Sequence, residues 1–162
     1  MPLPNHVNPD HFLALPHAVA VTKEHVRAAW ERAYTELHQK LEVLGSLGTL
    51  YMVFGIQGGG KTTWVESNAP RLGPNAVFLD GPLPSRNHRA RALVIAKEAG
   101  CKAVAVWVNT SFEVAWARNS IRPGLARIRE EAMRHVQGQL EAPSVEEGFS
   151  QVIHVSATDT EP

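Results

Sequence analysis

The chain has 162 residues, of which 44% are hydrophobic, so it has the size of one globular domain with enough apolar side chains for a core. Its 16 Lys and Arg residues balance 16 Asp and Glu residues, and this neutral charge gives no reason to expect tight nucleic-acid or membrane binding by the molecule as a whole. The single cysteine, Cys101, excludes an internal disulfide framework, and the sequence shows neither a secretion leader nor an apolar run long enough to cross a bilayer. We expect a soluble, cytoplasmic protein.

The first part of the chain predicts an irregular segment followed by one helix. Residues 1–21 are rich in proline, and Thr22 offers an N-cap hydroxyl to a helical pattern that runs to about Leu44 and ends at Gly45. Apolar residues recur every three or four positions in this pattern and form a single stripe. We expect the stripe to pack on the core in preference to a second subunit, which makes residues 1–45 an N-terminal helical extension.

Strand and helix patterns alternate in the rest of the chain. Apolar, β-prone runs predict strands at 47–54, 76–79, 103–108 and 151–155, and helical patterns lie between them at 62–67, 86–99, 112–119 and 127–140. We expect the first of these helices to stop by Pro70. Strands that alternate with helices predict an α/β fold with a parallel sheet and helices on both faces.

The segment between the first strand and its helix is rich in glycine. Residues 55–62 fit the pattern G-x-x-x-x-G-K-[ST] at every specified position. Glycines let the backbone wrap around phosphate oxygens with its amide hydrogens pointing inward, and the helix N-terminus adds its positive dipole end. An ordinary glycine turn is the alternative interpretation. The residues expected to contact the nucleotide phosphates are Gly58, Gly59, Gly60, Lys61 and Thr62.

Three side chains are the expected catalytic and metal-binding groups near the phosphates. Lys61 is expected to bridge the β- and γ-phosphates of ATP, and the hydroxyl of Thr62 to hold Mg²⁺. Mg²⁺ also needs a nearby carboxylate, and Asp80 stands at the end of the second predicted strand. The alternative interpretation is that Asp80 caps a helix or stabilises a turn and has no role in metal binding.

Two arginines follow the third strand. Arg118 and Arg122 are four residues apart and therefore lie on one helical face if the helix continues, so they are candidates for a lid that stabilises a moving phosphoryl group. The alternative interpretation is that both arginines lie at a solvated helix end and have no role in a lid. Five histidines in the first quarter of the chain lack the spacing of metal ligands, and we interpret them as solvated or capping: His6, His11, His17, His25 and His38.

Four segments together resemble the kinase domain of the polynucleotide 5'-hydroxyl kinases, including the kinase half of the bifunctional kinase-phosphatases of nucleic-acid end repair. They are Gly60-Lys61-Thr62-Thr63-Trp64, residues 80–91, residues 118–122 and residues 139–149. The resemblance implies that residues 46–162 form a P-loop kinase domain with ATP and Mg²⁺ as cofactors. It also implies that the ATP phosphates lie on residues 58–63, with Thr63 among their contacts, that Arg118 and Arg122 are lid arginines, and that the γ-phosphate passes to a 5'-hydroxyl.

The chain departs from that family around one aspartate. Asp80 stands where the family has its general base, whereas residues 81–91 resemble those after a second, later aspartate. One aspartate therefore replaces two, and the segment between them is missing. Asp80 either accepts the proton of the acceptor hydroxyl or holds Mg²⁺. A protein that has lost its acceptor site and only binds or slowly hydrolyses nucleotide is the third possibility.

The acceptor is expected to be the 5' end of a nucleic acid. Arg86 and Arg89, with His88 and Arg91, would contact its phosphates, and an exposed arginine-rich helix is the alternative. A small-molecule hydroxyl, as in zeta-toxin-like or antibiotic kinases, is the first alternative acceptor, and a non-catalytic nucleotide-binding regulator is the second alternative function. The sequence leaves the oligomeric state open. The four tryptophans have two interpretations, stacking on nucleic-acid bases or packing in the core, and we favour the core: Trp30, Trp64, Trp107 and Trp116.

Overall fold

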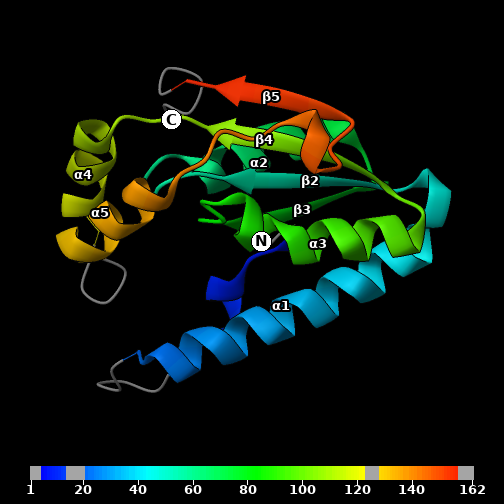
Figure 1. Cartoon of the computed structure of the whole chain (residues 1–162), viewed down its shortest axis with the longest axis horizontal. Coiled ribbons are helices and arrows are strands. Elements are labelled where there is room, and N and C mark those ends of the chain that lie inside the picture. The colour runs from blue at the N-terminus through cyan, green and yellow to red at the C-terminus, as the bar shows by residue number, and fades with distance from the viewer. Residues whose placement is uncertain (1–4, 14–20, 123–127, 157–162) are drawn as a thin grey trace.

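Five parallel strands form one sheet in the order β1-β3-β2-β4-β5. The structure is a computed structural model and describes residues 5–13, 21–122 and 128–156. β2, which leads into the glycine-rich loop, lies at the centre of the sheet (Figure 1). The predicted parallel α/β fold is confirmed. The strands are β1 (His6–Val7), β2 (Thr49–Phe54), β3 (Ala76–Gly81), β4 (Lys102–Val108) and β5 (Gln151–Val155).

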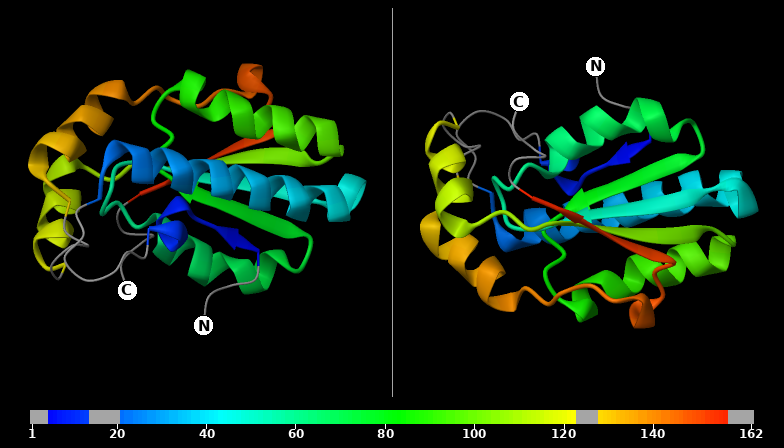
Figure 2. Two further views of the ribbon diagram at one scale, coloured as in Figure 1. Left: turned by 90° about the horizontal axis from the view of Figure 1, so that it is seen from below. Right: turned by 90° about the horizontal axis from the view of Figure 1, so that it is seen from above.

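Helices cover both faces of the sheet, as predicted. α1 and α3 pack on one face and α2 on the other, while α4 and α5 lie beyond the carboxyl ends of the strands (Figure 1). Seen from below, α1 crosses in front of the sheet, and seen from above it lies behind the strands (Figure 2). The helices are α1 (Lys23–Leu44), α2 (Lys61–Leu72), α3 (Arg86–Ala99), α4 (Phe112–Ser120) and α5 (Glu130–Gln139), with short 3₁₀ turns η1 (Pro9–Phe12), η2 (Gly45–Leu47) and η4 (Val145–Glu147).

The predicted caps define both ends of α1. The Thr22 hydroxyl accepts a hydrogen bond from the His25 amide, the His25 ring accepts one from the Thr22 amide, and Gly45 follows the last helical residue. The apolar stripe of α1 is buried and belongs to the same hydrophobic cluster as the residues of the sheet beneath it. α1 therefore packs on the core. Its fully buried stripe residues are Ala33, Leu37 and Leu41.

The core has two halves, one on each side of the sheet. Leu50, Met52 and Phe54 face α1 and α3, and Val53 faces α2, because successive residues of a strand point to opposite faces. All four tryptophans pack against hydrophobic clusters, as the core interpretation predicts. No helix among the described residues is both long and apolar enough to cross a membrane.

Four elements differ from the sequence expectations. The segment expected to be irregular contains β1, a strand too short to leave a periodic signal, which pairs with the edge of β3. α2 continues past Pro70, which lies in its last turn and removes only a terminal hydrogen bond. The start of the predicted strand 47–54 belongs instead to η2, and α5 begins at 130, while residue 127 lies outside the described residues.

Candidate functional site

The glycine-rich loop leaves the centre of the sheet at its carboxyl edge. β2 ends at Phe54 and α2 begins at Lys61, so the loop lies between the ends of the neighbouring strands β3 and β4. Gly60 precedes α2 with φ of 102°, and Gly58 has φ of 79° with its Cα so close to α4 that an added Cβ would stand 2.6 Å from the Ala115 carbonyl oxygen. A side chain at either position would strain the backbone. The loop has the strand and helix context that the motif requires.

Lys61 folds back over the loop. Its Nζ donates to the carbonyl oxygens of Gly55 at 3.1 Å and of Ile56 at 3.2 Å. Burial lowers the pKa of the Lys61 ammonium; the carboxylates of Asp80 and Asp10 oppose that change, and the Arg122 guanidinium reinforces it. The two hydrogen bonds thus hold the ammonium at the loop. An anion there would bind the ammonium more strongly than the neutral carbonyl oxygens do and can replace them.

Thr62 and Asp80 are in direct contact. The Thr62 hydroxyl donates to Oδ2 of Asp80 over 2.7 Å. The parallel register sets Asp80 beside Val53 of β2, just before the loop, and the Asp80 residue is only 1% exposed. The structure therefore brings together the two residues that the sequence assigned to the metal, although 18 positions separate them in the chain. Thr63 lies in the first turn of α2 and is half-buried.

The N-terminal segment adds two contacts that sequence reasoning missed. Nε2 of His6 lies 3.0 Å from Oδ2 of Asp80, and Nδ2 of Asn8 donates to the same oxygen over 3.3 Å. His6 is 6% exposed, so its interpretation as a solvated or capping residue was wrong. Nothing in the sequence marks a two-residue strand that reaches Asp80 from 74 positions away.

Oδ1 of Asp80 is in a different situation from Oδ2. It is buried and has no hydrogen-bond partner in the part of the chain that the structure describes. A buried carboxylate oxygen without a partner is costly, and such atoms are often satisfied by a water, an ion or a ligand. Oδ1 is therefore the atom of this carboxylate that is left for chemistry.

The two lid candidates approach the loop from the side of β4. Nη1 of Arg118 donates to the Gly59 carbonyl oxygen over 3.0 Å, and the hydroxyl of Thr110 donates to the same oxygen over 2.7 Å. Arg122 lies near enough to Lys61 for its charge to lower the pKa of that lysine. Three cationic side chains therefore surround the loop.

Hydrophobic contacts fix α4 and α5 against the loop. Ile56 of the loop packs in one buried cluster with Phe112 and Ala115 of α4 and Met133 of α5. Phe112 also carries the Arg134 guanidinium 4.1 Å above its ring. The position of α4 and α5 is therefore coupled to the conformation of the loop.

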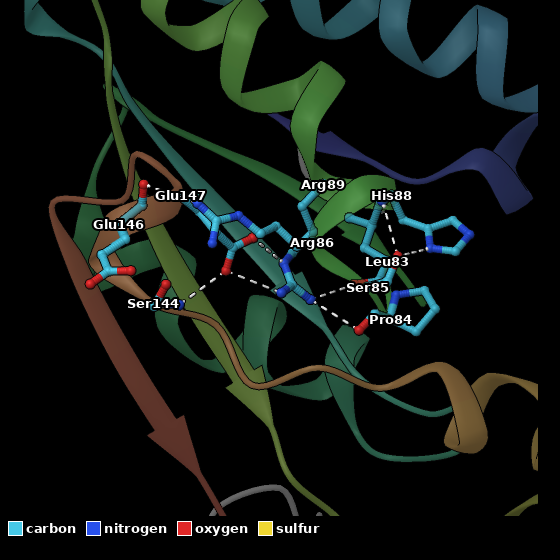
Figure 3. A network of polar contacts seen from close by, with 9 residues as sticks. All are labelled: Leu83, Pro84, Ser85, Arg86, His88, Arg89, Ser144, Glu146 and Glu147. Carbon is cyan, nitrogen blue, oxygen red and sulfur yellow. Dashed lines mark hydrogen bonds and ion pairs between the residues drawn. The ribbon is translucent and has the colours of Figure 1, made fainter.

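The two arginines assigned to the acceptor lie in different surroundings (Figure 3). Arg89 is fully buried: Nε and Nη2 donate to the Glu147 carboxylate at 2.9 and 3.1 Å, and Nη1 donates to the carbonyl oxygens of Leu83 and Pro84, both at 3.1 Å. The expectation that Arg89 contacts substrate is corrected, because its guanidinium is bonded inside the protein. Arg86 is exposed, with one contact of 3.4 Å to the Glu146 carbonyl oxygen, and it can meet a ligand.

The residues present fit a Mg²⁺ ion that is shared with a nucleotide. Mg²⁺ prefers hard oxygen ligands and is commonly held by one or two protein groups together with phosphate oxygens. The Thr62 hydroxyl and the Asp80 carboxylate supply such oxygens beside the loop, and Oδ1 lacks a partner. No cluster of three or more His, Cys, Asp or Glu side chains that could hold a metal occurs among the described residues.

Fold and site together define an α/β protein with a P-loop between its central strand and the following helix. No protein-family model matches the chain, and no curated protein sequence matches it. Among solved structures, the chain is similar to an unliganded sugar kinase from Janibacter sp. HTCC2649, with a TM-score of 0.46 and 14% identity over 98% of this chain and 72% of that chain. This likeness is too low to carry an argument about activity, and no comparison points to the polynucleotide kinases.

Proposed function

We propose that the protein is an ATP-dependent kinase that transfers the γ-phosphate to a hydroxyl group. The observation that carries this proposal is that positively charged side chains and oxygen ligands for a metal ion meet at one loop. Lys61 and Arg118 bring positive charge to it through their bonds to loop carbonyls, and the Thr62 to Asp80 pair brings hard oxygens to the start of the following helix. Phosphoryl transfer depends mainly on such positioning and on electrostatic stabilisation.

Each group has at least one role in the proposed site. Loop amides and Lys61 hold the β- and γ-phosphates, and Arg118 and Arg122 neutralise charge on the moving phosphoryl group. Thr62 and Asp80 would hold Mg²⁺, which neutralises charge on the phosphate oxygens when it is bound.

Asp80 also faces the acceptor in this proposal. Its carboxylate accepts the proton as the O–H bond of the acceptor breaks, and the acceptor oxygen forms a bond to the γ-phosphorus. The bond from that phosphorus to the bridging oxygen breaks, and ADP leaves with the electron pair. A weak base suffices, because the transition state of phosphoryl transfer is loose.

The resemblance to polynucleotide 5'-hydroxyl kinases and the exposed Arg86 favour the 5' end of a nucleic acid as acceptor. A small-molecule hydroxyl is the second candidate, and one observation favours it. The burial of Arg89 removes a charge from the surface expected to track nucleic-acid phosphates. The two candidates share the same nucleotide site and differ in the acceptor alone.

A labelling assay tests both candidates. The protein is incubated with γ-labelled ATP and Mg²⁺, together with 5'-hydroxyl DNA, 5'-hydroxyl RNA, nucleotide sugars, aminoglycosides or no acceptor. Label in an oligonucleotide supports the first candidate, label in a small molecule supports the second, and release of phosphate alone indicates an ATPase. Lys61→Ala should abolish the activity, whereas Lys97→Ala, an exposed lysine of α3, should not change it. Binding without any turnover would contradict the kinase proposal.

A further inference from the structure

The N-terminal segment brings two donors to the central carboxylate of the site. His6 and Asn8 both contact Oδ2 of Asp80, the oxygen that also accepts from Thr62. We propose that His6 and Asn8 are positioning residues that fix the Asp80 carboxylate for phosphoryl transfer. The inference rests on the proposed kinase function and makes the N-terminal extension part of the active site.

Backbone pairing fixes the location of both residues. His6 lies opposite Phe78 and Val7 opposite Leu79 in the parallel register of β1 and β3, and the Phe78 amide donates to the Asn5 carbonyl oxygen over 2.8 Å. Val7 is fully buried in the core under α1. The strand is short, but its pairing and its buried valine hold it beside the end of β3.

The side chain of Asn8 has only one useful orientation. Its Oδ1 accepts the Asp10 amide over 2.9 Å and so caps η1. This bond leaves the amide nitrogen, Nδ2, pointing at Asp80, and an amide nitrogen can donate but not accept. The cap therefore determines which end of Asn8 faces the carboxylate.

His6 is oriented in a similar way. A carboxylate oxygen can only accept, so Nε2 must carry the hydrogen in the contact with Asp80. The ring is buried and meets the His11 ring edge to face, with 5.2 Å between their centroids and 83° between their planes. Packing on one side and the hydrogen bond on the other leave the imidazole little freedom.

The consequence is an asymmetric carboxylate. Oδ2 receives three donors, two of them from the N-terminal segment, while Oδ1 has none among the described residues. Donors on one oxygen prevent rotation of the carboxylate and keep the other oxygen in a constant position. Misplacing a reacting group by about 1 Å can cost about a hundredfold in rate.

Four variants test the proposal: His6→Ala, His6→Gln, Asn8→Ala and the control His38→Ala, an exposed histidine of α1. Gln can place a donor nitrogen near the position of Nε2, so it keeps the hydrogen bond without the ring. The first readout is the ¹³C signal of the Asp80 carboxyl group, assigned with Asp80→Asn. We expect His6→Ala and Asn8→Ala to shift it, and His6→Gln and His38→Ala to leave it near its wild-type position.

Steady-state kinetics with MgATP give the second readout. We expect His6→Ala to lower kcat by about tenfold or more while KM for ATP changes by less than about threefold, because the carboxylate is displaced and the phosphate loop is not. His6→Gln should recover most of the lost kcat. Thermal melting of each variant shows whether the fold is intact.

The two readouts separate this inference from the kinase proposal. An unshifted Asp80 signal in His6→Ala would overturn the inference. It would also be overturned if His6→Ala and His6→Gln lost kcat equally and in proportion to their loss in melting temperature, because the effect would then be one of stability alone. A wild-type protein without turnover would count against the kinase proposal, and the Asp80 signal would still decide whether His6 and Asn8 hold the carboxylate.

Discussion

Asp80 is the residue at which the glycine-rich loop, the central sheet and the N-terminal segment meet. It is the penultimate residue of β3, accepts a hydrogen bond from the first turn of α2 and contacts both polar residues that flank the buried Val7. Neutralising its charge weakens the acceptor for these donors and the oxygen ligand proposed for Mg²⁺. Substitution of this single residue is therefore a direct test of the proposed phosphoryl transfer.

Asp80→Asn should lower the turnover rate by at least about a hundredfold, as the loss of a general base or a metal ligand does. The substitution preserves the shape of the side chain, so the fold should survive, which circular dichroism can verify. Glu113→Gln, an exposed carboxylate in the first turn of α4, is the matched control. Wild-type turnover in Asp80→Asn would remove Asp80 from the mechanism.

Cys101 gives a test of local packing away from the site. Burial raises the pKa of its thiol, and its Sγ donates to the Gly45 carbonyl oxygen over 3.0 Å. Because the thiolate is the reactive form, alkylation of the folded protein should need a higher pH than alkylation of the same cysteine in urea. Iodoacetamide labelling over a pH series measures this, and identical profiles for folded and unfolded protein would contradict the packing around Cys101.

At the scale of elements, one buried ion pair joins the start of α3 to the segment before β5. Arg89 of α3 and Glu147 of η4 are 58 positions apart, and Glu147 also accepts the Ser144 amide over 3.0 Å. Arg89 further holds the carbonyl of Leu83, a residue with φ of 36° just after β3. The pair thus supports the turn that follows Asp80.

Glu147→Ala should destabilise the protein by about 3–5 kcal/mol, because removing one partner leaves the buried guanidinium of Arg89 without its counter-charge. Urea unfolding followed by tryptophan fluorescence measures the change. Glu31→Ala removes the partner of the exposed Arg91 and serves as the control with a far smaller effect. Equal losses in the two variants would show that the Arg89 to Glu147 pair is not a structural tether.

Local signals explain which elements the sequence predicts. The Thr22 cap, the Gly100 stop of α3 and the glycines of the loop are signals read within a few residues, and the structure has all three where they were expected. The partners of Arg89 and His6 lie 58 and 74 positions away, so no local pattern can separate a buried arginine or histidine from an exposed one. Asp80 and Thr62 were predicted together because Asp80 ends one predicted strand and Thr62 follows the loop after another.

At the scale of the whole molecule, the parallel sheet determines where the site lies. Every strand points its carboxyl end toward the same edge, so the loop, the end of β3 and the start of α4 meet there (Figure 1). The chain is neutral overall, with 16 basic and 16 acidic residues, yet Lys61, Arg118 and Arg122 gather at this edge. Any affinity for an anion should therefore be local to the loop.

Isothermal titration of the protein with MgATP tests this directly. We predict a saturable heat of association at one site, weakened by at least about tenfold in Lys61→Ala, since the ammonium contributes a charge-assisted contact to the phosphates. Lys97→Ala should bind like the wild type. The absence of any heat of binding, or equal affinity in the wild type and Lys61→Ala, would contradict the assignment of residues 55–62 as a nucleotide-binding loop.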